Sequence, residues 1–112
     1  MQVKISVRHG HLNDDHQTLI REKAEQLLQF FDRLNFIEVT VDLHQQRTDG
    51  ARKVEIVATA EHKHEFVAQG EHEDIMTALG TASDKVKQQI KHYKEKLQDH
   101  RRDPSHNDIG NK

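Results

Sequence analysis

The stretch that decides the fold is DIMTALGTASDKVKQQIKHYKEKLQDH, residues 74–100. Its apolar side chains recur at steps of three and four residues over about seven turns, which predicts one long helix. Seven of them fall on a single stripe, so the helix must pack on one apolar surface supplied by the rest of the chain. The stripe consists of Ile75, Leu79, Ala82, Val86, Ile90, Tyr93 and Leu97.

The segments before this helix supply that surface. Apolar and polar residues alternate over residues 2–8, 37–44, 52–60 and 65–71, and this alternation predicts four strands. The positions predicted to be buried are Val3, Ile5, Val7, Ile37, Val39, Val41, Leu43, Val54, Ile56, Ala58, Phe66, Ala68 and Gly70.

An earlier helix is predicted to follow the first strand. Asn13 is a favourable N-cap, and Asp14 and Asp15 lie where the helix dipole favours negative charge. Its apolar residues recur at helical spacing and extend the predicted stripe as far as residue 34. They are Ile20, Ala24, Leu27, Phe31 and Leu34.

The element order is therefore β-α-β-β-β-α, which indicates an α+β fold. One four-stranded mixed sheet with two helices packed on one face satisfies every apolar stripe. Residues 45–51 are predicted to form a loop and residues 61–64 a hairpin connection. We expect a single domain over residues 1–100, followed by a polar, disordered tail over residues 101–112 that contains Pro104.

Composition excludes several classes of protein. The 112 residues contain no Cys, which removes disulfides, thiol catalysis and thiolate metal sites, and no segment has the length of apolar sequence that a membrane span needs. We therefore expect a soluble, cytoplasmic protein. The sequence has no Gly-rich phosphate loop and no nucleophile motif, and the acidic pairs at 14–15 and 73–74 are explained by helix starts. An enzyme is not expected, nor is a cofactor.

The ten histidines raise the question of a metal site. His9 with His11, and His62 with His64, place pairs of imidazoles on one side of an extended chain, which suits zinc or nickel if a third ligand is added. Both pairs fall at strand ends or turns in polar sequence, so surface histidines are favoured and no metal is expected.

The charges are strongly separated along the chain. The net charge is −2, but residues 1–83 carry −5 and residues 84–112 carry +3. At 100° per residue, basic side chains border both edges of the last helix's apolar stripe, while the acidic ones project from its back. One edge has Lys87, Lys91 and Lys94, the other has Lys85, His92 and Lys96, and the back has Asp84, Glu95 and Asp99.

The outward face of the predicted sheet is acidic and lacks the aromatic residues on which RNA bases would stack. It carries Glu38, Asp42, Glu55, Glu61 and Glu71, relieved by Lys4, Arg8 and Lys53. Two functions remain open on charge alone. In the first, the helix lysines bind RNA phosphates; in the second, the lysines are merely solvated and the acidic sheet is a protein-interaction module for a basic partner.

Residues 84–97, DKVKQQIKHYKEKL, resemble the terminal-helix signature of the ribosome hibernation-promoting and ribosome-associated inhibitor proteins. Residues 31–34 resemble the end of that family's first helix, Lys23 falls on its usual lysine, and residues 71–78 match its approach to the final helix. The resemblance runs from residue 1 to about residue 43 and resumes from the third predicted strand, so it covers roughly residues 1–100. It implies a fold similar to a double-stranded-RNA-binding domain.

The resemblance also implies a function. Such proteins are non-enzymatic factors of stress and stationary phase that bind the small (30S) ribosomal subunit at the decoding region. There they contact 16S ribosomal RNA, occlude messenger RNA and A- and P-site tRNA, and inhibit translation. The implied RNA contacts are Lys23, Lys85, Lys91, Lys94 and Lys96, to which charge geometry alone adds Lys87. A monomer is expected away from the ribosome.

The sequence departs from the family pattern at two positions. Gln88 lies near a position that is often Arg, and Met76 replaces a residue that is commonly aromatic. From the resemblance we also expect a short form of the family, without the C-terminal dimerisation domain of longer relatives. The segment after residue 100 is longer than in relatives that promote the pairing of ribosomes, and shorter than in inhibitors that keep ribosomes as single particles. The sequence therefore leaves open which of these two effects the protein has.

Overall fold

The structure is a computed structural model that describes residues 2–44, 50–61 and 64–102, with the backbone alone for residues 97–102. The predicted loop at 45–51 and hairpin at 61–64 fall partly outside these residues, and the predicted tail falls outside them from residue 103 onward. The elements are β1 (Gln2–Arg8), α1 (Asp14–Phe30), β2 (Leu34–Asp42), β3 (Arg52–Ala60), β4 (Glu65–His72) and α2 (Ile75–Arg102).

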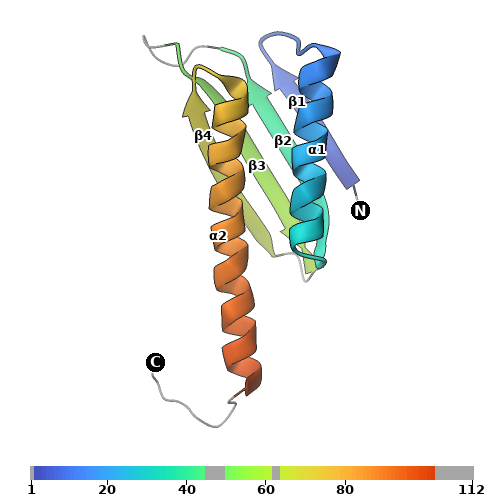
Figure 1. The fold of residues 1–112 in the computed structure, drawn as a ribbon, viewed down its shortest axis with the longest axis vertical. Helices are drawn as coiled ribbons and strands as arrows, with labels where there is room; N and C mark the ends of the chain where they lie inside the picture. The colour runs from blue at the N-terminus through green and yellow to red at the C-terminus, as the bar shows by residue number, and fades with distance from the viewer. Residues whose placement is uncertain (1, 45–49, 62–63, 103–112) are drawn as a thin grey trace.

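The four strands form one mixed sheet in the order β1-β2-β3-β4. β1 pairs with β2 in parallel, as the α1 crossover between them requires, and the other two pairs are antiparallel. Both helices lie side by side on one face of this sheet, and α2 continues past its end (Figure 1). The predicted α+β fold, with two helices on one face of a four-stranded sheet, is confirmed.

The first helix begins as predicted and ends earlier. The Asn13 side chain accepts a hydrogen bond from the His16 amide at 2.8 Å, and the helix stops at Phe30. Phe31 is its C-cap and Leu34 opens β2, so the prediction that both continue the helical stripe was wrong. The error arose because both side chains are buried, and their spacing continues the helical period across a turn.

The core fills the space between the sheet and the two helices. Every inward position predicted for β2, β3 and β4 is buried except Leu43, which lies just beyond the end of β2 and is half-buried. Val3, Ile5 and Val7 of the edge strand β1 are also only half-buried. From α2 the core receives Ile75, Ala78, Leu79, Ala82, Val86 and Ile90, with Met76 and Tyr93 packed at its border.

The outward face of the sheet differs from the prediction at Phe36. Because β2 begins at Leu34, with a register shift before Phe36, this ring takes an outward position opposite Thr59. The prediction that outward positions carry no aromatic residue was therefore wrong, although Phe36 is half-buried. Glu61 lies past the end of β3, where it pairs with Arg33 at 3.0 Å.

Candidate nucleic-acid interface

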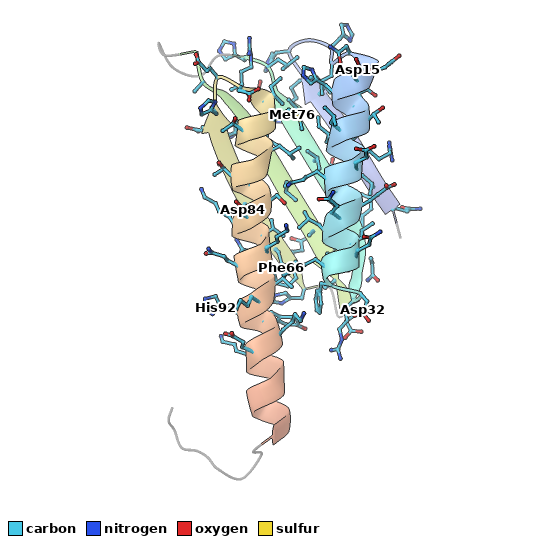
Figure 2. The ribbon with its side chains drawn as sticks, in the orientation of Figure 1. Asp15, Asp32, Phe66, Met76, Asp84 and His92 are labelled. Atoms are coloured by element: carbon cyan, nitrogen blue, oxygen red, sulfur yellow. The ribbon has the colours of Figure 1, made fainter. Side chains whose placement is uncertain are left out.

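The six lysines predicted to bind RNA lie on the helix layer but do not form one cluster. α2 carries Lys87 and Lys94 on the flank that faces α1, and helical spacing places Lys91 next to them. Lys85 lies on the opposite flank, over the open edge of β4, and helical spacing places Lys96 on that flank as well. Lys87 is half-buried, and the other four are exposed. His92 lies on the flank away from α1 (Figure 2). Gln88, one of the two departures from the family pattern, is exposed.

On the flank that faces α1, two lysines lie over the ring of Phe30, which the sequence analysis did not identify. The Lys94 ammonium lies 5.4 Å from the centroid of the Phe30 ring, and the Lys87 ammonium lies 5.8 Å from it. Lys94 also lies 5.9 Å from the ring of Phe31. At these distances the electron-rich faces of the rings attract the ammonium groups, which holds the two lysines over the end of α1.

Lys23 belongs to the same side of the molecule. It precedes Phe30 by seven residues, which is close to two helical turns, so both side chains lie on one flank of α1. Lys23 is half-buried while Phe30 is exposed. The groove face, defined as Lys23 and Phe30 of α1 with Lys87, Lys91 and Lys94 of α2, therefore combines four cations with one aromatic ring.

On its opposite flank, α2 is hydrogen-bonded to the edge strand β4. The Lys85 ammonium donates a hydrogen bond to the Gln69 carbonyl at 3.0 Å, and the Gln89 side-chain amide donates to the Val67 carbonyl at 2.8 Å. Both carbonyls belong to β4, the strand at the edge of the sheet. Capping them blocks pairing with another strand. An ammonium has three donors, so Lys85 keeps two for another acceptor.

A cluster of aromatic rings around Tyr93 holds α2 against the sheet. The ring of Tyr93 lies 5.5 Å from Phe66 and 6.0 Å from Phe31, both edge to face. His64 stacks on Tyr93 with centroids 4.4 Å apart. Phe66 lies under α2 at the end of the sheet where α1 finishes (Figure 2). Lys94 follows Tyr93 directly in α2, so the packing of Tyr93 also positions the backbone of Lys94 relative to the sheet.

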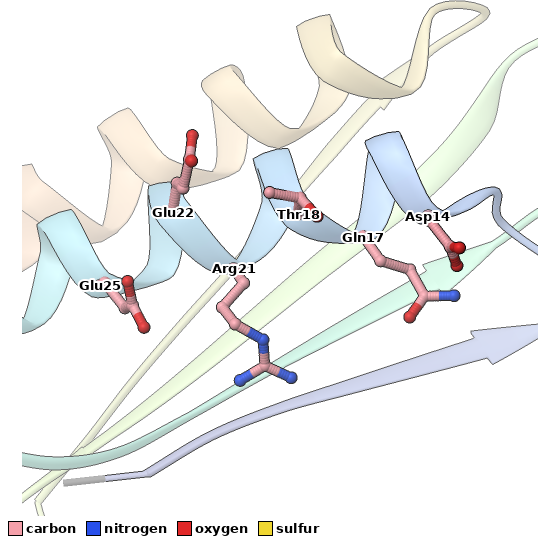
Figure 3. Close-up of a pocket in the computed structure, with 6 residues that line it drawn as sticks. All are labelled: Asp14, Gln17, Thr18, Arg21, Glu22 and Glu25. Carbon is pink, nitrogen blue, oxygen red and sulfur yellow. The ribbon is translucent and has the colours of Figure 1, made fainter.

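The other flank of α1 does not suit an anion. It borders an open hollow lined by side chains of that helix alone (Figure 3). Three of them are carboxylates and one is a guanidinium, so phosphate would be repelled there. The residues are Asp14, Gln17, Thr18, Arg21, Glu22 and Glu25.

The histidine pairs do not assemble a metal site within the part of the chain that the structure describes. His9 instead donates from Nδ1 to Asp42 at 2.8 Å, and the His44 amide donates to the same carboxylate at 3.0 Å. These hydrogen bonds lower the pKa of Asp42, and the one from His9 has the larger effect. Of the second pair, His62 falls outside the described residues.

The geometry can be compared with known proteins. Residues 3–98 match the family described as sigma 54 modulation protein / S30EA ribosomal protein. The chain belongs to this family. The match confirms the resemblance found in the sequence, and it extends over both helices and all four strands up to residue 98.

Similar members of the S30EA family are named ribosome hibernation promoting factor. The one from Pseudomonas putida is 29% identical over 98 residues, covering 88% of this chain and 91% of its own length. That from Azotobacter vinelandii is 32% identical over 98 residues, covering 86% of this chain and 85% of its own length.

Solved structures share the fold at lower identity. A ribosomal subunit interface protein from Coxiella burnetii superposes with a TM-score of 0.73 at 15% identity, over 85% of this chain and 99% of that one. The N-terminal domain of Thermus thermophilus Protein Y gives 0.68 at 19% identity, over 83% and 99%. In the described residues, no helix is both long and apolar enough to cross a membrane.

Proposed function

We propose that this protein is a ribosome hibernation factor that binds the small ribosomal subunit through its groove face. It contacts 16S ribosomal RNA in the decoding region, where its bulk occludes messenger RNA and the A- and P-site tRNAs. Translation stops by occlusion, without a catalytic step. The protein acts in the cytoplasm of stressed or stationary-phase cells and is monomeric away from the ribosome.

One observation carries this proposal. In a family whose similar members are named ribosome hibernation promoting factors, two lysines of α2 lie over an exposed aromatic ring of α1, and helical spacing assigns Lys23 and Lys91 to the same side of the molecule. The four ammonium groups suit the evenly charged backbone of RNA, which they would neutralise without regard to sequence. Lys85, at the edge of β4, and Lys96, on the same flank of α2 by helical spacing, add contacts only where the RNA also reaches that flank.

The alternative function, docking of a basic protein on the acidic sheet, has less support. Several of the outward carboxylates are already engaged within the sheet. Glu38 accepts a hydrogen bond from the Ser6 hydroxyl at 3.3 Å and faces Lys4 at 3.9 Å, while Glu55 accepts one from Gln69 at 3.0 Å. A basic partner would have to displace these contacts, whereas the groove face lysines have no carboxylate partner within 4.0 Å in the described residues.

The test is co-sedimentation with purified small subunits. Replacing Lys87, Lys91 and Lys94 together with Glu should abolish binding, because each replacement turns an attraction for phosphate into a repulsion. A matched control reverses three exposed basic residues outside the groove face, Lys4, Arg8 and Arg21, so the net charge changes by the same amount. Binding that survives in the first variant, or is lost equally in both, contradicts the proposal.

The same assay tests the alternative. Charge reversal at Glu38, Asp42 and Glu55 should leave small-subunit binding intact if the groove face carries it. Loss of binding in that variant, with the lysine variant unaffected, would move the function to the sheet. Circular dichroism of each variant checks that the fold is retained.

A further inference from the structure

The exposure of Phe30 is not explained by the fold. Three large hydrophobic residues are exposed in the described part of the chain, Leu19, Phe30 and Val67, and Phe30 alone among them is aromatic. Its ring is 42% exposed, while the neighbouring Phe31 is buried and packs edge to face on Phe66 and Tyr93. Phe31 thus serves the core, and Phe30 offers a partly exposed aromatic surface with two lysine ammonium groups over it.

The surroundings of this ring suit two of the three parts of a nucleotide, its base and its phosphate. A flat aromatic surface stacks with any unpaired base, and ammonium groups beside it pair with the phosphates on either side of that base. Lys87 and Lys94, at 5.8 Å and 5.4 Å from the ring centroid, are placed for this. Their flexible stems let the ammonium groups turn from the ring to a phosphate.

We propose that Phe30 is a stacking site for one unpaired RNA base, with Lys87 and Lys94 on the adjoining phosphates. This inference rests on the proposed function and deepens it, because phosphate contacts alone do not distinguish single strands from duplexes. In a duplex each base is already stacked between its neighbours and cannot reach the ring. The groove face therefore selects a single-stranded segment of RNA.

The test compares two RNA probes by fluorescence anisotropy at one fixed salt concentration. One is an end-labelled single-stranded 12-mer, and the other is a blunt duplex of the same length. Phe30→Leu keeps an apolar side chain and removes the aromatic face, so its affinity for the single strand should fall by about five- to thirty-fold while duplex affinity stays within about two-fold. Phe30→Tyr should behave as the wild type.

The matched control is Leu19→Ala. Leu19 is 45% exposed on the same helix, and truncating it should change neither affinity. An equal loss on both probes in Phe30→Leu would show that the ring only positions the lysines, and no loss on either would show that it does not stack. A wild-type protein that binds the single strand no better than the duplex would overturn the inference as well.

The inference and the proposed function fail separately. If Phe30→Leu binds the single strand as the wild type does, but the lysine variant still loses the small subunit, the phosphate contacts remain and only the stacking site is wrong. If the wild-type protein shows no co-sedimentation with small subunits, the proposed function fails, whatever the probes report.

Discussion

Gly70 sets the distance between α2 and the sheet, and replacing it with Ala should separate them. A Cβ at this position would lie 3.0 Å from the Ala78 carbonyl carbon and 3.1 Å from the Ala82 amide nitrogen, and it would overlap the Ala78 carbonyl oxygen. All of these are backbone atoms of α2, so no side chain can turn away. The helix itself must move.

The size of the effect follows from that movement. Relieving the overlap requires a shift of about 1 Å, and a gap of that size forfeits roughly half of the dispersion energy across the contact. The contact includes the fully buried Leu79, Val86 and Ile90 of α2. We expect the free energy of unfolding to fall by about 3 kcal/mol, near the upper end for overpacked cores. This corresponds to a melting temperature lower by about 12–24 °C.

Gly80 provides the matched control. It lies inside α2, and a Cβ there would meet no heavy atom of the described residues within 4 Å, apart from its chain neighbours and the backbone of its own helix. Gly80→Ala should therefore raise the free energy of unfolding by about 0.5–1 kcal/mol, because Ala has the better helix propensity. Thermal denaturation followed by circular dichroism measures both variants. A Gly70→Ala protein that melts within about 5 °C of the wild type would refute the reasoning, since it corresponds to a cost of only about 1 kcal/mol.

Two other changes have a defined sign. Ser83→Ala should raise the free energy of unfolding by about 1 kcal/mol in urea denaturation, because the fully buried hydroxyl has no hydrogen-bond partner in the described residues and Ala favours the helix; a less stable variant would mean that the hydroxyl is bonded. Asp42→Asn should lower stability at neutral pH, because the hydrogen bond from His9 lowers the folded-state pKa of Asp42. That stabilisation is present above the ordinary Asp pKa and is lost as the pH falls through the lower folded value, so the two proteins should converge in acid; a constant difference down to pH 2 would contradict the assignment.

Much of the fold could be predicted because local periodicity encodes it. Burial alternates along β3 and β4 as the sequence pattern requires, and the apolar stripe of α2 is continuous. The same rule failed at Phe31 and Leu34, where a turn happens to preserve helical spacing. It also missed the outward position of Phe36, which depends on where β2 begins.

Of the candidate site, the sequence could predict only that lysines line both edges of the apolar stripe of α2. Helical geometry placed Lys87 and Lys94 at one margin of α2, but it could not show that α1 brings Phe30 beneath them, because that depends on the spacing between helices. One signal was present in the sequence. Phe30 and Phe31 are adjacent at the end of a helix, and adjacent residues point about 100° apart, so both rings could not enter the same core. The contact of Lys85 with β4 depends on strand order and gave no such signal.

The salt dependence of small-subunit binding tests the groove face most directly. The logarithm of the binding constant should fall linearly with the logarithm of salt concentration, with a slope set by the number of phosphates neutralised. For the variant with Lys87, Lys91 and Lys94 replaced by Gln, the slope should be shallower by about two to three, whereas replacing Lys4, Arg8 and Arg21 by Gln should leave it unchanged. Equal slopes and affinities in all three proteins would contradict phosphate binding by this face.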